Sequence, residues 1–318
     1  MSQVFEHIPV LFNECMEGLE IRPDGCYIDC TAGGGGHSSG IAARLDGRGR
    51  LVSIDKDDEA LAACGEKIKN FPGIDWRTVK ADFVDIRDVA EELKLDRIDG
   101  ILADLGVSSH QIDTPERGFS YALPGPLDMR MDNSRPLTAE KVINTYSEED
   151  LADIFYKYGE ERYSRRIAAG IVRDRKTKPF TDTITLANAI ASYMPGRGRG
   201  EDQHPARRCF QALRIEVNGE LDGLQKMLDD SVELLSDGGR IAVISFHSLE
   251  DRIVKDTFKT WENPCICPKD FPVCTCGRKP KGKVITRKPV VASPDEVKCN
   301  RRAHCCKLRI FEKIIERG

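Results

Sequence analysis

The first third of the chain alternates between short apolar runs and longer stretches with helical spacing. The apolar runs, typical of buried strands, occupy residues 27–30, 49–55, 76–81 and 99–106. The stretches with a helical pattern occupy residues 38–45, 57–69 and 84–93. The strand–helix unit recurs about every 25 residues, and this rhythm predicts a parallel sheet with helices on both faces.

The rhythm stops after the fourth apolar run. A loop rich in Gly, Pro, Ser and Asp precedes helical patterns at 139–144, 148–158, 162–175 and 183–193. One long helix or two then lead to a strand, a helix and a last strand, at 205–235, 239–246, 249–261 and 307–313. We expect a sheet domain of residues 1–111 and 212–318, interrupted by an all-helical insertion at 112–211.

The first candidate site follows the first apolar run. Four glycines, Gly33 to Gly36, lie between a predicted buried strand and a predicted helix. Glycine suits a sharp turn whose backbone comes close to a ligand, as at the nucleotide site of a doubly wound α/β fold. A flexible surface loop is the alternative, and the buried strand before it speaks against that interpretation.

The next strand ends at Asp55, which lies 20 positions after Gly35. At that spacing a carboxylate accepts hydrogen bonds from the hydroxyls of an adenosine ribose. The dinucleotide pattern G-x-G-x-x-G is not matched, because Ser38 or Ser39 stands at its third glycine. We therefore favour a nucleoside ligand such as S-adenosylmethionine over NAD, and an NAD-linked oxidoreductase is the alternative.

Ligands of α/β sheets bind beyond the carboxyl ends of the strands. The residues at or just after these ends are Gly33, Gly34, Gly35, Gly36, His37, Asp55, Asp82, Phe83, Asp104, Ser108, Ser109 and Gln111. The glycine backbone is expected near the methionine part of the cofactor and Phe83 against the adenine. Asp104 is expected near the sulfonium or the amino group. Each of these residues alone also suits a strand-end turn or a core position.

Several long motifs resemble one family, the RsmH (MraW) family of bacterial 16S ribosomal RNA cytosine-N4 methyltransferases. They include D-C-T-A-G-G-G-G-H-S at 29–38, A-D-L-G-V-S-S-H-Q-I-D at 103–113, R-G-F-S-Y at 117–121, G-P-L-D-M-R-M-D at 125–132, H-P-A-R-R-C-F-Q-A-L-R-I-E-V-N-G-E-L at 204–221 and S-F-H-S-L-E-D-R-I-V-K at 245–255. The resemblance extends from His7 to about Arg309.

This resemblance implies a Rossmann-like methyltransferase that uses S-adenosylmethionine, with the helical insertion for substrate. It implies a cytosine in the decoding region of the small ribosomal subunit as the target. The family's cofactor contacts fall on Gly35, Gly36, His37, Asp55, Phe83, Asp104 and Gln111. A catalytically inactive ribosome-binding factor with the same fold is a further alternative.

Methyl transfer to cytosine N4 requires groups that accept hydrogen bonds from the amino hydrogens. Asp104, Ser108 and Ser109 are of the right type, and the base is expected to leave its stack.

A protein that binds RNA also needs a positively charged surface. Residues 277–309 hold 11 Lys/Arg against 2 Asp/Glu. A second basic group comprises Arg197, Arg199, Arg207, Arg208 and Arg214.

The composition fits a globular protein of 318 residues, with 40% hydrophobic residues and a net charge of −4. No run approaches the roughly 20 apolar residues of a membrane span, and no signal peptide is evident, so the cytoplasm is expected.

The chain has twelve cysteines, and in a reducing compartment we expect them to be free thiols or metal ligands rather than disulfides. Two CxC pairs, Cys265–Cys267 and Cys274–Cys276, predict either a structural zinc site or four unliganded thiols. Monomer and homodimer both remain open.

Overall fold

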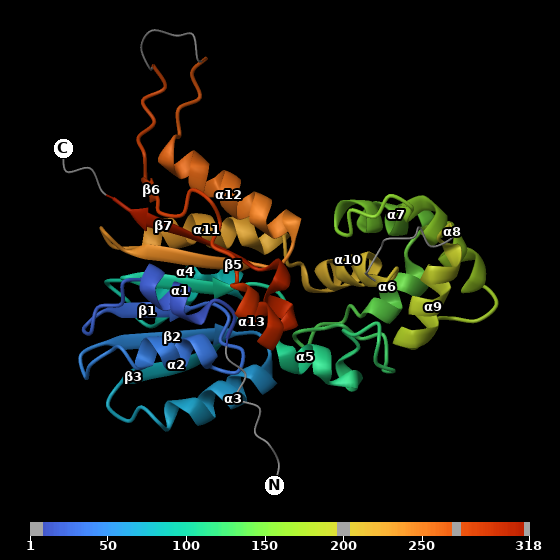
Figure 1. Cartoon of the computed structure of the whole chain (residues 1–318), viewed down its shortest axis with the longest axis horizontal. Helices are drawn as coiled ribbons and strands as arrows, with labels where there is room; N and C mark the ends of the chain where they lie inside the picture. The colour runs from blue at the N-terminus through green and yellow to red at the C-terminus, as the bar shows by residue number, and fades with distance from the viewer. Residues whose placement is uncertain (1–8, 196–203, 269–274, 315–318) are drawn as a thin grey trace. The chain divides into compact units, whose positions relative to one another are not determined.

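A computed structural model describes residues 9–195, 204–268 and 275–314. The chain divides into two compact units. Unit 1 comprises residues 1–106 and 221–318, and unit 2 comprises residues 107–220. Figure 1 shows strands and helices in the first unit and helices in the second. The residues of unit 2 that the structure describes form no strand.

Unit 1 is built on a seven-stranded sheet in the order β3-β2-β1-β4-β5-β7-β6. Its parallel strands are β1 (Cys26–Asp29), β2 (Arg50–Asp55), β3 (Asp75–Lys80), β4 (Gly100–Asp104) and β5 (Arg240–Ser245). Two further strands, β6 (Gly282–Val284) and β7 (Lys307–Lys313), run antiparallel at the β5 edge. This is the sheet of the methyltransferase fold, as predicted, with one strand, β6, that the sequence did not predict.

Two hydrophobic clusters cover the two faces of the sheet. One face packs against α4 (Ile86–Glu92), α11 (Asp222–Leu234) and α12 (Ser248–Glu262). The other packs against α1 (Phe12–Gly18), α2 (Gly36–Ala42), α3 (Asp58–Ile68) and the segment from α13 (Pro294–Cys299) through η3 (Arg301–Cys305). Helices therefore lie on both faces, and the parallel strands β1, β2, β4 and β5 are buried from both sides, whereas the edge strand β3 is partly exposed. This confirms the predicted layers.

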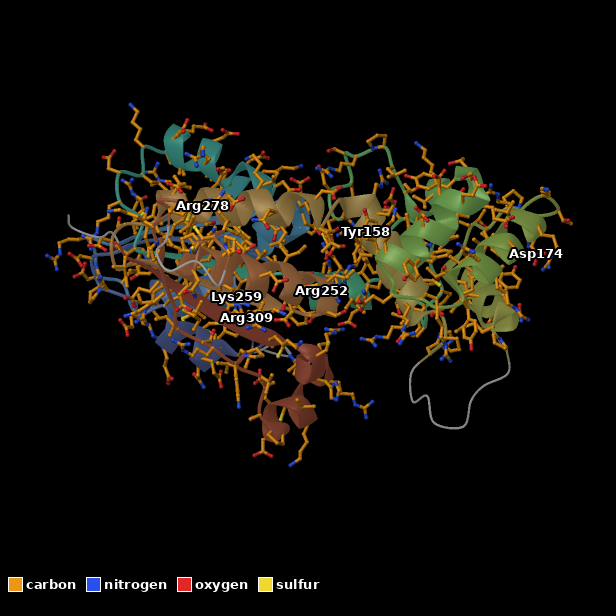
Figure 2. The ribbon with its side chains drawn as sticks, turned by 90° about the horizontal axis from the view of Figure 1, so that it is seen from above. Tyr158, Asp174, Arg252, Lys259, Arg278 and Arg309 are labelled. Atoms are coloured by element: carbon orange, nitrogen blue, oxygen red, sulfur yellow. The ribbon has the colours of Figure 1, made fainter. Side chains whose placement is uncertain are left out.

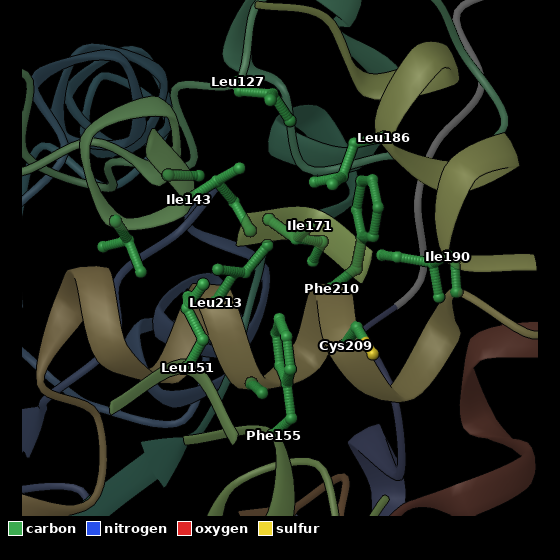
Figure 3. Packing of buried hydrophobic residues seen from close by; sticks show 14 of the residues in the cluster. Leu127, Ile143, Leu151, Phe155, Ile171, Leu186, Ile190, Cys209, Phe210 and Leu213 are labelled. Atoms are coloured by element: carbon green, nitrogen blue, oxygen red, sulfur yellow. The ribbon is translucent and has the colours of Figure 1, made fainter. Parts of the chain in front are cut away.

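Unit 2 has a hydrophobic core of its own, shown in Figure 3. Its helices are α5 (Ser109–Asp113), α6 (Ala139–Thr145), α7 (Glu148–Lys157), α8 (Ser164–Asp174), α9 (Thr183–Tyr193) and α10 (Arg207–Asn218). Phe155, Ile171 and Leu213 are fully buried in the core. Thr138 and Ser147 cap α6 and α7 as predicted, because their side chains accept hydrogen bonds from Lys141 N and Asp150 N.

The region predicted as one long helix or two contains two, α10 and α11. The break lies at Gly219, whose φ of 63° is left-handed and ends α10. In the described part of the chain, no helix is long and apolar enough to cross a membrane.

Candidate functional site

The glycine loop joins β1 to α2 at the carboxyl edge of the sheet. Gly33 and Gly35 have φ angles of 47° and 73°, which residues with a Cβ atom rarely adopt. A Cβ on Gly36 would lie 2.3 Å from Pro9 Cγ, whereas one on Gly34 would meet no atom within 4 Å. The loop is thus packed on its protein side and open at Gly34, where its backbone can approach a ligand.

Asp55, at the end of β2, holds this loop in place. Its Oδ2 accepts a hydrogen bond from Gly33 N at 2.8 Å, and its Oδ1 accepts one from Asp57 N at 3.0 Å. Burial raises the pKa of the carboxyl, and the two backbone donors oppose that rise. Each carboxylate oxygen can accept a further bond, so ribose binding by Asp55 stays a prediction that these contacts permit.

Asp104 and His37 are brought together in unit 1. His37 Nδ1 lies 3.6 Å from Asp104 Oδ2, and His37 Nε2 lies 3.1 Å from the Val10 carbonyl oxygen, to which an Nε2–H can donate. Burial lowers the pKa of His37 to about 4. The imidazole is therefore neutral at physiological pH and brings no positive charge to the carboxyl.

The Asp104 side chain is 25% exposed, but its Oδ1 atom is buried and accepts no hydrogen bond within the described part of the chain. Burial, followed by the nearby charges of Asp29 and Glu250, raises the pKa of Asp104 to about 8. A buried acceptor without a partner carries a desolvation cost that a bound donor would relieve. Asp104 is therefore suited to a ligand that supplies a donor and a positive charge.

Phe83 begins a short 3-10 helix, η1 (Phe83–Asp85), after β3. Lys56 Nζ lies 5.7 Å from the centroid of its ring and 3.2 Å from Asp82 Oδ2. A Cβ on Gly223 of α11 would lie 3.4 Å from the ring, so this helix packs close to it. The ring is half-buried at the same edge as the glycine loop, and its contact with adenine stays a prediction.

Ser108, Ser109 and Gln111 belong to unit 2, whereas Asp104 belongs to unit 1. Ser108 Oγ accepts from Gln111 N at 3.2 Å, and Gln111 Oε1 accepts from Ser108 N at 3.0 Å. This capping box begins α5, whose first residue is Ser109. The local geometry of these three residues is defined, and their roles beside Asp104 stay predictions.

A buried polar network that the sequence analysis did not single out lies behind the glycine loop. Asp29 is fully buried, and its carboxylate accepts from Ser38 Oγ at 2.6 Å and from Thr31 N at 3.1 Å. Thr31 Oγ1 in turn accepts from Asp104 N at 2.7 Å. Burial raises the pKa of Asp29 to about 7. The available signal was a carboxylate inside an apolar strand, which seldom occurs without a buried partner.

The network continues to the next strands. Ser38 Oγ lies 2.7 Å from Ser53 Oγ, and Trp76 Nε1 donates to Ser53 Oγ at 2.8 Å. Ser38, which stands where a dinucleotide site would have a glycine, therefore holds the Asp29 carboxylate. This contact gives the departure from G-x-G-x-x-G a structural reason.

Three of the four cysteines predicted as metal ligands are described, and they lie together. The Sγ atoms of Cys265, Cys267 and Cys276 are all within 4.8 Å of one another. Cys274 lies outside the described residues.

In the second basic group, Arg197 and Arg199 also lie outside the described residues. Arg214 of that group forms an ion pair with Glu220 through two hydrogen bonds of 2.8 and 2.9 Å.

Comparison with known proteins gives one consistent result. Residues 4–314 match the model of the MraW methylase family. The chain is 54% identical over 310 residues to ribosomal RNA small subunit methyltransferase H of Carboxydothermus hydrogenoformans, covering 98% of each chain. It is 51% identical to the protein of the same name from Symbiobacterium thermophilum, over 98% of this chain and 97% of that relative.

Among solved structures, the chain is similar to an rRNA methylase from Streptococcus thermophilus, with a TM-score of 0.44 and 9% identity over 97% of this chain and 99% of that one. A similarity at this level carries no conclusion about activity, which rests on the family match and on the curated relatives.

Proposed function

This chain belongs to the MraW methylase family, and from that premise we propose that it transfers a methyl group from S-adenosylmethionine to N4 of a cytosine in the decoding region of 16S ribosomal RNA. The observation that carries this proposal is the full-length match, at 54% identity, to a relative named ribosomal RNA small subunit methyltransferase H. The cytosine and its N4 atom come from the motif resemblance, so nucleoside analysis is needed to test them.

The residues at the strand ends fit the cofactor. There is open space beside the backbone at Gly34, and the buried Oδ1 of Asp104 can accept a hydrogen bond from a cationic ligand. Asp55 and Phe83 supply an acceptor for the ribose and a ring for the adenine. When bound, S-adenosylmethionine supplies an electrophilic methyl group, and these residues hold it and exclude water from it.

The acceptor nitrogen needs help from the protein, since the N4 lone pair of cytosine is delocalised into the ring. A carboxylate or hydroxyl oxygen that accepts from the amino hydrogens lets the nitrogen pyramidalise toward the methyl group. Asp104, Ser108 and Ser109 are the groups that we assign to this role. The transfer requires no metal, so we assign a structural rather than a catalytic role to any zinc that the cysteines bind.

The basic segment of residues 277–309 is the best candidate for the RNA-binding surface. Its exposed cations include Arg278, Lys279, Lys283, Arg287, Lys288, Lys298 and Arg301. Exposed basic residues also lie on α12, where Figure 2 labels Arg252 and Lys259. Arg309, by contrast, is buried against Asp251 and is a structural residue. Exposed cations on one stretch of an acidic chain favour phosphate contacts.

The test is methyl transfer from labelled S-adenosylmethionine to unmodified small ribosomal subunits, followed by nucleoside analysis. We expect N4-methylcytidine from the wild type and none from Asp104→Ala. Glu66→Ala is the matched control, because the Glu66 side chain is 72% exposed and forms a surface ion pair with Lys69. Label in another nucleoside, or in no RNA at all, would contradict the substrate.

The two rival functions have their own readouts. A titration that shows tight binding of NAD and none of S-adenosylhomocysteine would favour the oxidoreductase. Binding of S-adenosylhomocysteine without turnover on free RNA, on subunits or on their assembly intermediates would favour a ribosome-binding factor without catalysis.

A further inference from the structure

We propose that the loop between α12 and β6 binds a structural Zn²⁺ ion through the thiolates of Cys265, Cys267 and Cys276. This loop lies outside the methyl-transfer site, and the zinc proposal does not depend on the proposed function. Figure 1 shows its two described arms running alongside each other from the end of α12 and the start of β6.

The spacing of the sulfur atoms fits a tetrahedral metal site. All three Sγ atoms lie within 4.8 Å of one another, and Cys276 Sγ lies 3.9 Å from Cys265 Sγ. A Zn–S distance of about 2.3 Å places two tetrahedral ligands about 3.8 Å apart. A disulfide would need about 2.05 Å. The cysteines are therefore spaced as ligands of one ion and too far apart for a covalent S–S bond.

The surroundings of Cys267 favour the thiolate, which is the form that binds metal. Thr275 N donates to Cys267 Sγ at 3.3 Å, and Thr275 Oγ1 lies 3.6 Å from the same sulfur. Backbone donors to a liganding sulfur are the outer contacts expected of a metal site.

The cysteines of the hydrophobic clusters lie in a different environment from those of the loop. Burial raises the pKa of Cys15, Cys30 and Cys209 well above the usual thiol value. Those thiols are protonated packing residues. Cys265, Cys267 and Cys276 are exposed or half-buried instead, so their position is not explained by core packing.

The hydrogen bonds between the backbone segments of the two arms lie close to the sheet in the described part of the loop. Near the sheet its two arms are joined, because Lys281 N donates to the Trp261 carbonyl and Val284 N donates to Glu262 Oε1. Further out, Ile266 is 65% exposed. Ordering exposed residues costs conformational entropy, and a metal that joins the two arms would offset that cost.

Thiolate ligands select Zn²⁺, Cu⁺ or iron–sulfur clusters over hard cations. Zinc is the choice here because three thiolates on a short loop can complete a tetrahedron with one more ligand. The fourth ligand is tested separately, since Cys274 lies outside the described residues.

The experiment measures metal in the full-length protein, purified without chelator, by elemental analysis and native mass spectrometry. We expect one zinc per chain in the wild type and in Cys299→Ser, whose exposed cysteine lies outside the cluster. We expect at least a tenfold loss of zinc affinity in Cys265→Ser and in Cys276→Ser. An equal loss in Cys274→Ser would identify the fourth ligand, and full retention there would leave the site with three thiolates.

Two further measurements keep the proposal falsifiable if a serine variant folds poorly. Chemical modification of the exposed thiols should release zinc from the wild type in proportion to the thiols modified. Co²⁺ should bind in place of zinc, and the Co²⁺ protein should then show the thiolate-to-metal absorption of a tetrahedral site. A folded, metal-free wild type after zinc supplementation, zinc retained in the Cys265→Ser/Cys276→Ser protein, or bound iron in place of zinc would each overturn the proposal.

Discussion

Two aspartates of unit 1, Asp104 at the end of β4 and Asp251 in α12, are both largely buried, with side chains 25% and 12% exposed. Asp251 accepts from Arg309 Nε at 2.6 Å and from Lys307 Nζ at 2.9 Å. Within the described part of the chain, the Asp104 carboxylate is paired with no cation, and the neutral His37 lies 3.6 Å from it. One carboxylate is thus supplied with cations by the fold, and the other is not.

The pKa values of the two carboxyls follow from this difference. Burial raises the pKa of both, but at Asp251 the hydrogen bonds and charges of Arg309 and Lys307 outweigh it and lower the pKa. At Asp104 nothing opposes burial, and its pKa rises to about 8. The comparison teaches that a carboxylate paired within the fold stabilises the protein, whereas one left unpaired is ready for a cationic ligand.

The largest effect expected is on stability, at Asp251. Asp251→Ala leaves Arg309, which is 7% exposed, with an uncompensated buried charge. We expect the free energy of unfolding to fall by about 3–5 kcal/mol, measured by urea denaturation. Methyl transfer per folded molecule should not change. A loss of transfer at full stability would contradict the structural role of Asp251.

The converse substitution, Asp104→Asn, keeps the shape of the side chain and removes its charge. We expect kcat/KM to fall about 100-fold, the equivalent of the roughly 1.5–3 kcal/mol of a hydrogen bond to a charged group. The free energy of unfolding should not decrease, because a buried carboxyl with no cation is costly to ionise. If Asp104→Asn instead destabilised the protein as Asp251→Ala does, the contrast between the two carboxyls would be wrong.

Cofactor affinity should depend on pH through Asp104. Below pH about 8 this carboxyl holds a proton in the free protein, and a cationic ligand must displace it. Affinity for S-adenosylmethionine should therefore rise with pH, by at most tenfold per unit, and level off above that pKa. Calorimetry in buffers of different ionisation enthalpy would also detect the released proton, and Asp104→Asn should abolish both effects.

The same titration with S-adenosylhomocysteine identifies the cation that Asp104 faces. The product keeps the amino group but lacks the sulfonium charge. A flat profile for the product would assign Asp104 to the sulfonium, and a profile parallel to that of S-adenosylmethionine would assign it to the amino group.

Local sequence signals predicted much of this arrangement. The strand–helix rhythm gave β1 to β4, and hydroxyl residues at helix starts gave the caps Thr138 and Ser147. The strands and the caps were predicted correctly because short-range periodicity and capping chemistry determine them. The strand-end rule also selected Asp104 as a ligand contact, and that role stays a prediction.

What escaped prediction depends on contacts between distant segments. The three-residue β6 pairs with β7 across a gap of more than 20 residues, and no local pattern specifies that pairing. The pairing of Asp251 with Arg309 joins positions 58 residues apart. Asp29 looked like one residue of an apolar strand, because the partners that make its burial possible come from α2 and from the loop after β1.

The smallest effect expected is at the far end of the network that holds Asp29. Trp76→Phe removes the indole N–H that donates to Ser53 Oγ at 2.8 Å. We expect a loss of about 1 kcal/mol in stability from the hydrogen bond, in addition to the loss of ring area. Trp261→Phe is the matched control for that area, since Trp261 is also buried but packs against Phe258 and Phe311.

The pH profile separates the two tryptophan variants. Ser53 joins Trp76 to Ser38 and so to Asp29, and the charge of Asp29 raises the pKa of Asp104. Losing the Trp76 donor should weaken the support for the ionised form of Asp29 and move the midpoint of cofactor binding to lower pH. Trp261→Phe should leave that midpoint unchanged. Equal midpoints in both variants would mean that the network stabilises the sheet but does not tune Asp104.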